Sequence, residues 1–348
     1  MVNRSMHCFS SRLSCLCPIL FELIPVIVCL WILDSVAYAQ ESPFLKFGRV
    51  TAGRFDGDGK QVILASEGSL KLLDLKNTLV VHNESGLESR SGKERFESGR
   101  NIHAIGSIEV AFPKITKMDF SPDKKSLLIA GGDPGQRGCI QVLQWPSGML
   151  QRSIETRADG KPLSDLVMDI KWFADGSRWI ETHWNDGALV RGTDGQILGS
   201  FSGHTGPVTG GLAWSSELAI TGGIDQTIKL WRISDGEILR NFDNHTGAII
   251  GLLRWKDPDS KALLVSLGRD RTLRLWDPEI GRLIRFVRLP GLPLKMDFSG
   301  NDGLVVLLES GKLSCVSLPD LAIQETVALE ERSVTTLVPI VPRRWLYW

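Results

Sequence analysis

The strongest constraint on the fold is an internal repeat, in which an aromatic residue ends an alternating strand and is followed by a polar turn. The residues in this position are Phe55, Phe120, Phe173, Trp214, Trp255 and Phe298. The last three intervals are 41, 41 and 43 residues, and the first two are 65 and 53 residues. The longer intervals contain two candidate insertions, a polar loop at 83–101 and an expanded turn at 131–138. The chain is therefore predicted to repeat one unit of about 41 residues.

Each unit contains four short runs of alternating or apolar residues divided by Asp, Gly and Ser, which is the pattern of strands and turns. One unit predicts strands at 208–214, 217–221, 227–231 and 237–242. The next unit predicts strands at 248–255, 262–266, 272–276 and 283–287. No helical period extends over three turns after residue 39. Because four-stranded propeller blades run about 40–45 residues, the repeat predicts an all-β fold, a β-propeller of four-stranded antiparallel blades.

Two consecutive units carry the same four residue types at the same spacing. The first set is His204, Thr221, Asp225 and Trp231, and the second set is His245, Ser266, Asp270 and Trp276. In both sets the Asp follows the hydroxyl residue by four positions and precedes the Trp by six. The sets resemble the tetrads of the WD40-repeat family, in which a Gly-His pair, a Ser/Thr, a turn Asp and a Trp-Asp ending recur. Two positions depart from the family pattern. Arg232 follows Trp231 where Asp is usual, and Asn244 precedes His245 where Gly is usual.

The resemblance implies that the tetrads are structural. The Asp accepts from the His ring, the His pairs with the hydroxyl, and the hydroxyl reaches the Trp ring N–H. An orphaned member would cost about 1–3 kcal/mol, because these polar groups lie between packed sheets. The alternative is a Ser/Thr–His–Asp catalytic triad, but a nucleophile site is not expected twice in consecutive units. The unit at 167–192 keeps Thr182 and Asp186 and has Gly192 where the Trp is expected.

The C-terminal end leaves two arrangements of the ring open. Six complete units extend from about residue 50 to 325, and a seventh begins at 333–339 and continues into 343–348. The preferred prediction is seven blades with an incomplete last blade, and the alternative is six blades with an appended hairpin. Propellers close by lending one terminus to the blade made by the other, and residues 43–47 are available to donate a strand.

The first 39 residues predict an export signal. Arg4 and Arg12 precede an apolar stretch at 23–33, and Ala37-Tyr38-Ala39 is a small-x-small pattern, so cleavage is expected between Ala39 and Gln40. The rival interpretation, an anchor helix, needs roughly 20 apolar residues. The predicted domains are a signal peptide at 1–39 and a single propeller at 40–348. The expected product has no stable membrane span and is periplasmic or secreted.

Composition and motifs argue against several classes of function. Lys+Arg and Asp+Glu number 40 each, so no basic field favours nucleic acid. His82, His103 and His183 lie in three different units without ligand spacing, and no haem-attachment, phosphate-loop or nucleophile motif occurs after residue 39. We therefore expect no cofactor, no metal and no enzymatic activity. Cys139 and Cys315 lie in distant units, so a disulfide between them is not expected.

The resemblance to WD40 proteins implies a scaffold that binds protein partners at one rim of the ring. The positions that it places there are Arg269, Ile224, Pro207, Ala248, Trp184 and Asn185. Arg269 is the best single candidate, because Arg is enriched among residues that dominate binding energy; the alternative is a surface Arg that pairs with Asp257 or Asp259. The alternatives are a ring segment of a larger exported enzyme or haem protein, suggested by the end at Trp348, or a propeller enzyme whose site is built from scattered loops.

Overall fold

The computed structural model describes residues 50–55, 61–66, 69–74, 103–155, 160–256, 261–299, 302–328, 337–341 and 344–347. All regular structure in these ranges is β-strand, and none of them contains a helix that could cross a membrane. The described strands form six four-stranded sheets and one two-stranded sheet. Within each sheet, every strand pairs antiparallel with the strand next to it in sequence. The six larger sheets are called blades 1 to 6 in chain order.

The strand bounds follow the repeat. Blade 1 contains β1 (Val50–Phe55), β2 (Gln61–Ser66), β3 (Ser69–Asp74) and β4 (His103–Glu109). Blade 2 contains β5 (Lys114–Phe120), β6 (Ser126–Asp133), β7 (Arg137–Gln144) and β8 (Leu150–Ile154). Blade 3 contains β9 (Val167–Trp172), β10 (Arg178–His183), β11 (Ala188–Gly192) and β12 (Ile197–Phe201).

The second half of the ring has the same plan. Blade 4 contains β13 (Val208–Ala213), β14 (Leu218–Gly223), β15 (Ile228–Arg232) and β16 (Ile238–Phe242). Blade 5 contains β17 (Ile249–Lys256), β18 (Ala262–Gly268), β19 (Thr272–Asp277) and β20 (Arg282–Arg288). Blade 6 contains β21 (Pro293–Phe298), β22 (Gly303–Leu308), β23 (Lys312–Ser317) and β24 (Ala322–Ala328), and β25 (Leu337–Val341) pairs with β26 (Arg344–Tyr347).

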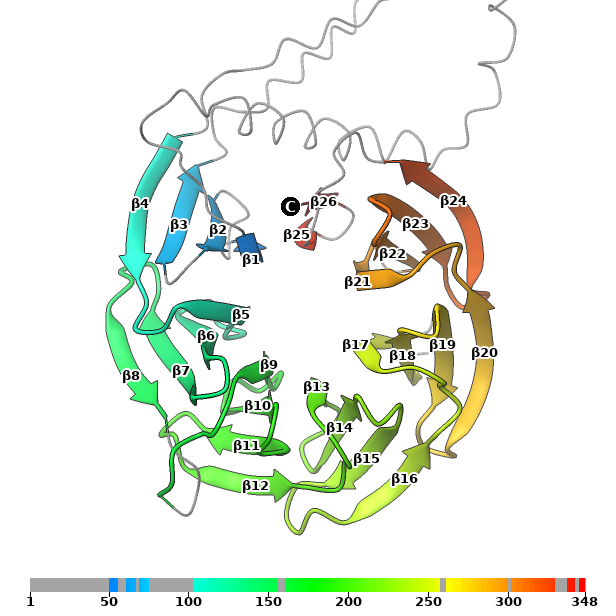
Figure 1. Cartoon of the computed structure of the whole chain (residues 1–348), viewed down its shortest axis with the longest axis horizontal. Coiled ribbons are helices and arrows are strands. Elements are labelled where there is room, and N and C mark those ends of the chain that lie inside the picture. Colours follow the sequence, from blue (N-terminus) through cyan, green and yellow to red (C-terminus); the bar gives the residue numbers. More distant parts are fainter. Residues whose placement is uncertain are drawn as a thin grey trace, which may run out of the picture.

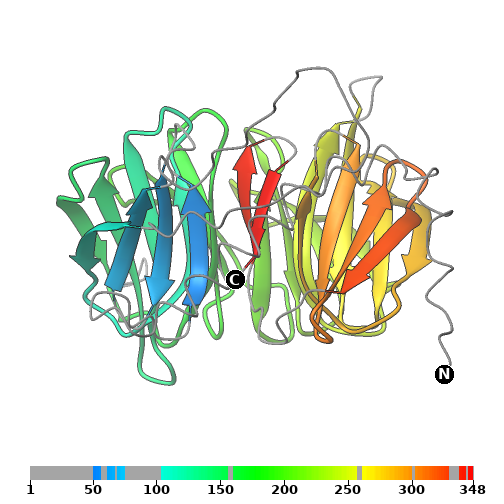
Figure 2. The same cartoon turned by 90° about the horizontal axis from the view of Figure 1, so that it is seen from above.

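The blades stand around a ring (Figure 1). The first strand of each blade lies nearest the centre and the fourth strand lies on the outside. The β25–β26 hairpin lies between blade 1 and blade 6, and β25 contacts both β1 and β21 (Figures 1 and 2). The hairpin therefore occupies the seventh position as a two-stranded unit, consistent with the predicted ring of six complete blades and an incomplete last one. Residues 43–47, suggested as a closing strand, lie outside the described residues.

The core lies between the blades rather than inside any one of them. The second and third strands are buried on both faces, as the continuous apolar runs of β6 and β18 illustrate, because each sheet packs on two neighbours. One buried cluster joins Trp255 of blade 5 to Leu304 of blade 6, and another joins Ile180 of blade 3 to Trp231 of blade 4. Each blade therefore depends on the next for its stability.

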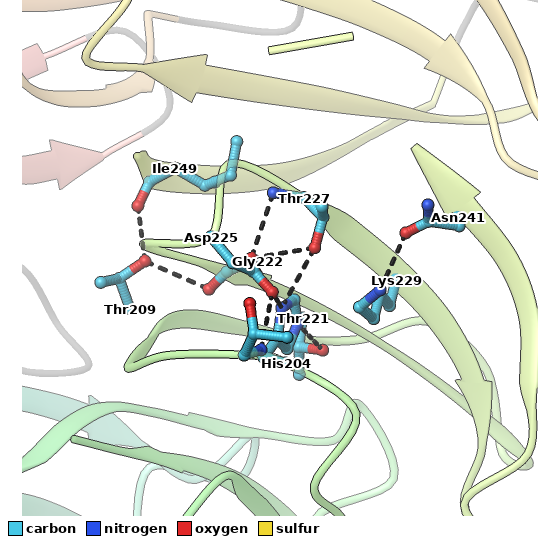
Figure 3. Close-up of polar contacts among 10 residues, drawn as sticks. His204, Thr209, Thr221, Gly222, Asp225, Thr227, Lys229, Asn241 and Ile249 are labelled. Atoms are coloured by element: carbon cyan, nitrogen blue, oxygen red, sulfur yellow. Dashed lines mark hydrogen bonds and ion pairs between the residues drawn. The ribbon is translucent and has the colours of Figure 1, made fainter. Parts of the chain in front are cut away.

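Hydrogen bonds near the centre also join neighbouring blades. Thr209 on β13 donates its hydroxyl to the carbonyl oxygens of Gly222 and Ile249, the second of which belongs to blade 5 (Figure 3). Thr116 on β5 makes the same bridge from blade 2 to the Val167 carbonyl of blade 3. A threonine at this position donates to a carbonyl oxygen on the innermost strand of the next blade, where the sheet of that blade provides no further strand to pair with it.

The strands expected in the two tetrad units are confirmed, and each strand end lies within two residues of its predicted position. The expected turn expansion at 131–138 is wrong. The segment instead extends two paired strands, in which Gly132 pairs with Gly138 and Asp133 with Arg137. Glycine is needed here because a Cβ at Gly131 would lie 1.9 Å from the Lys114 carbonyl oxygen. The predicted signal peptide at 1–39 and the loop at 83–101 lie outside the described residues.

The two cysteines within the described ranges are not bonded to each other. Cys139 on β7 and Cys315 on β23 are free and buried. Burial raises the pKa of each thiol to about 11. Both therefore behave as small apolar side chains of the core, and the thiolate needed for reactivity is strongly disfavoured.

Candidate functional site

Blade 5 contains a complete tetrad. His245 precedes β17, Ser266 lies on β18, Asp270 lies in the turn after β18, and Trp276 lies on β19. Asp270 Oδ2 is 2.8 Å from His245 Nδ1, and Ser266 Oγ is 2.7 Å from His245 Nε2. The Trp276 ring N–H donates to Ser266 Oγ over 2.8 Å. With the His245 proton on Nδ1, each group donates to the next, from indole to hydroxyl to imidazole to carboxylate.

The turn carboxylate of Asp270 is held by more than the histidine. It accepts from the Thr246 N–H, the Thr272 N–H and the Thr272 hydroxyl at distances of 3.0, 3.0 and 2.7 Å. Burial would raise the pKa of Asp270, but these hydrogen bonds and His245 outweigh it and hold the pKa below its ordinary value. Burial lowers the pKa of His245 although Asp270 opposes this. The pair is therefore a carboxylate and a neutral imidazole at neutral pH.

Blade 4 repeats this arrangement up to its last member (Figure 3). His204 Nδ1 is 2.9 Å from Asp225 Oδ2, and His204 Nε2 is 2.9 Å from Thr221 Oγ1. Thr227 donates to the Asp225 carboxylate just as Thr272 does in blade 5. Neither threonine is part of the set expected from the sequence, although each stands two residues after the turn Asp.

The predicted hydrogen bond from Trp231 to Thr221 is wrong. The Trp231 ring N–H is buried and has no hydrogen-bond partner. Its ring lies flat on Phe201 of the preceding blade, with centroids 4.9 Å apart and planes 10° apart. Stacking in the core thus sets the orientation of Trp231, and the blade 4 tetrad ends at the hydroxyl.

Blade 3 replaces the tetrad with a different buried network. Thr182, kept from the motif, has no partner for its hydroxyl, and Asp186 accepts from Ser164 rather than from a histidine. The centre of the network is the buried carboxylate of Glu181, which accepts from the Trp179 ring N–H and from Arg191 Nε, each over 2.8 Å.

The charges of the blade 3 network balance one another. His183 Nε2 also lies 3.3 Å from Glu181. Burial would raise the pKa of Glu181, but His183 and Arg191 outweigh it and lower the pKa below its ordinary value. This network is not apparent from the sequence, because Glu181 and Arg191 become neighbours only through the register of β10 and β11.

The six predicted rim residues lie at one end of the blades. The turn between the second and third strands is tied to the entrance of the first strand by one repeated backbone hydrogen bond. The donor and acceptor pairs are Trp184 N to Leu166 O, Ile224 N to Pro207 O, Arg269 N to Ala248 O and Glu309 N to Leu292 O. The side chains of Trp184 and Ile224 are 40% and 39% exposed, and Asn185 and Arg269 are also exposed. The rim therefore presents an indole, an aliphatic group and a guanidinium on three consecutive blades.

One pocket among the described residues lies away from this rim. It has a volume of about 360 Å³ and lies between β8 and the turn before β12, lined by Arg152, Glu155, Arg191 and Asp194 among others. Arg191 is engaged by Glu181 and by the Gly195 carbonyl oxygen. No cluster of three potential metal ligands occurs in the described part of the chain, and the side chains of His82 and His103 lie outside it.

Comparison with known proteins identifies the repeats. The family model described as WD domain, G-beta repeat matches residues 195–232 and 236–277. Each match begins at the outer strand of one blade, β12 or β16, and ends at the third strand of the next, β15 or β19. A search of curated proteins found no match. The two matched repeats lie within a ring of four-stranded blades, and both observations support the WD40-repeat family.

Proposed function

We propose that the chain is an exported, non-catalytic scaffold that binds a protein partner at the rim carrying Trp184, Ile224 and Arg269. WD40 domains generally mediate protein–protein interactions, and this chain has two repeats of that family. The observation that carries the proposal is the exposure of an indole and an aliphatic side chain on the turns next to an arginine turn. Trp and Arg are enriched among the few residues that dominate binding energy at interfaces.

Export is supported by the first 39 residues, which combine Arg4 and Arg12 with an apolar stretch and a small-x-small junction at Ala39. The proposed compartment is the periplasm or the cell exterior. The mass of the protein isolated from its native cell tests this part. A chain that begins at Gln40 supports export and cleavage, and a chain that keeps residues 1–39 contradicts cleavage.

Site-directed photo-crosslinking tests the rim directly. A photoreactive residue placed at 184, 224 or 269 is expected to capture one protein partner in the native cell. The matched controls are positions 149 and 280, because Met149 and Ile280 are exposed apolar residues in turns at the opposite ends of the blades. Equal capture from both ends would contradict the assignment of the rim.

Affinity measurements with the captured partner complete the test. Trp184→Ala and Arg269→Ala are each expected to weaken binding about tenfold or more, or about 1.4 kcal/mol, since side chains of these types dominate interfaces. Met149→Ala is expected to leave the affinity unchanged. Wild-type affinity in both rim variants, with unchanged thermal unfolding, would overturn the proposed site.

A further inference from the structure

The outer strand of blade 5 differs from every other outer strand in the described ring. β20 reads RLIRFVR and carries Arg282, Arg285 and Arg288, whereas β4, β8, β12, β16 and β24 each carry at most one Lys or Arg. The net charge of the whole chain is zero, so this basic strand is a local feature. It is also the edge of its sheet, because the strand order is β17-β18-β19-β20.

Large apolar side chains are exposed among these arginines. Phe286 in the middle of β20 is 58% exposed, Ile284 is also exposed, and Ile280 in the preceding turn is 62% exposed. Together with the three arginines these residues are called the β20 edge. No other outer strand in the described ring exposes an aromatic side chain.

The exposed ring of Phe286 packs on the side chain of Arg274. The guanidinium carbon of Arg274 lies 5.4 Å from the ring centroid. Arg274 is itself largely buried, donates from Nε to the Thr272 hydroxyl, and lies 3.7 Å from Asp270 of the tetrad. Phe286 therefore presents an ordered surface for contact, which reduces the entropy lost on binding.

The neighbouring charges leave the β20 edge positive. Arg285 lies 3.4 Å from Asp320 of blade 6, and both side chains are exposed, so water screens this pair. Asp277, at the start of the turn that leads to β20, is engaged by Lys261. Arg240 of blade 4 donates to the Glu279 carbonyl oxygen and adds a further cation beside that turn.

Charged residues on an edge strand often only prevent aggregation. That role does not explain an ordered, exposed Phe286 and Ile284 at the centre of the strand, because apolar edges promote association. An extended peptide matches all three properties of the edge. Its backbone pairs with the free side of the strand, its acidic side chains face the arginines, and its apolar side chains cover the phenyl ring.

We propose that the β20 edge binds an extended acidic segment of a partner protein by strand addition, with carboxylates paired to Arg282, Arg285 and Arg288 and an apolar side chain packed on Phe286. The inference goes beyond the proposed rim function and does not depend on it. The two surfaces involve different residues, so variants separate them.

The test measures binding of a fluorescein-labelled, capped nine-residue peptide, Val-Glu-Val-Val-Glu-Val-Val-Glu-Val, to the purified full chain by fluorescence anisotropy. Its three glutamates have the spacing of the three arginines and lie on both faces of an extended strand. Phe286→Ser, and separately the triple change of the three arginines to glutamine, are each expected to weaken binding tenfold or more. Leu198→Ser on β12 is the matched control, because Leu198 is an exposed apolar residue of another outer strand. It is expected to bind like wild type, as is the rim variant Trp184→Ala.

Two further probes separate strand addition from simple charge attraction. The same peptide with alternate backbone nitrogens methylated keeps its charge and loses half of its donors, and it is expected to bind at least tenfold more weakly. A heparin fragment is expected not to displace the parent peptide at 0.15 M salt. Lack of binding by the parent peptide, equal binding of the methylated peptide, efficient displacement by heparin, or wild-type binding by folded β20 variants would each overturn the proposal.

Discussion

Blades 4 and 5 match the same family model and share the same tetrad residue types, yet only one tetrad is complete. In blade 5 the indole N–H of Trp276 donates to Ser266, whereas in blade 4 the indole N–H of Trp231 is buried without a partner. The His–Asp and His–hydroxyl contacts are the same within 0.2 Å. The difference therefore arises at the tryptophan and not at the polar end of the motif.

The neighbouring blade explains why the two tryptophans differ. Each packs on a phenylalanine that ends the outer strand of the preceding blade, Phe201 for Trp231 and Phe242 for Trp276. Phe201 lies flat on its partner at 10°, whereas Phe242 meets its partner by the edge at 69°. A Cβ at Gly203 would lie 2.5 Å from Phe201 Cζ, so glycine gives the flat ring its space. Asn244 carries a Cβ at the corresponding place in blade 5.

The largest expected effect comes from the blade that uses a different network. Glu181→Ala removes the buried carboxylate that accepts from Trp179 and Arg191, and breaking a buried ion pair by removing one partner costs about 3–5 kcal/mol. Chemical denaturation measures the free energy of unfolding. The matched control is Glu217→Ala, an exposed acidic residue, with a change within about 0.5 kcal/mol. A loss below about 1 kcal/mol in Glu181→Ala would contradict the charged network described for blade 3.

The second prediction compares the two tetrad hydroxyls. Ser266→Ala orphans both the Trp276 N–H and His245 Nε2, whereas Thr221→Val orphans only His204 Nε2. Each orphaned buried group costs about 1–3 kcal/mol. We expect a loss of about 2 kcal/mol or more for Ser266→Ala and about 1 kcal/mol for Thr221→Val, measured by urea unfolding. Equal losses would show that the two tetrads are equivalent in solution.

How far the sequence predicts the structure differs between these regions. The blade period follows from the spacing of the strand-ending aromatic residues, and both His–Ser/Thr–Asp sets follow from the resemblance to WD40 repeats. The Glu181 network follows from neither, because it depends on strand register. Its indole donor is Trp179 on the second strand of the blade, whereas the tetrad tryptophans lie on the third strand. The orientation of Trp231 depends on a ring from another blade, and no local motif records it.

The third prediction tests the explanation for the flat ring. Gly203→Ala places a methyl group where Phe201 lies, so the ring must turn away from Trp231. We expect a loss of about 1 kcal/mol, at the low end of overpacking costs, because a ring edge rather than backbone gives way. Near-ultraviolet circular dichroism is expected to change with it. The control is Asn244→Gly in blade 5, whose near-ultraviolet spectrum is expected to stay like that of wild type; an unchanged spectrum in Gly203→Ala would contradict the explanation.

The smallest expected effect is a loss of folding stability at acidic pH. Burial lowers the pKa of His204 and His245 below the ordinary value near 6.5. As the pH falls through that value, these histidines become protonated in the unfolded chain but stay neutral in the folded chain. The free energy of unfolding therefore decreases below about pH 6.5. The lowered pKa values of Asp225 and Asp270 preserve their contribution until the pH falls below about 3.8. Urea unfolding between pH 5 and 8 measures the slope, and a variant with both histidines changed to glutamine is expected to show a flatter one.

The most direct test of the difference between the blades is a pair of double-mutant cycles on the free energy of unfolding. One cycle combines Ser266→Ala with Trp276→Phe, and the other combines Thr221→Val with Trp231→Phe. The structure predicts a coupling energy of about 1 kcal/mol in blade 5, where the hydrogen bond exists, and none outside error in blade 4. Equal coupling in both blades would contradict the account, because it would mean that Trp231 and Trp276 make the same contact.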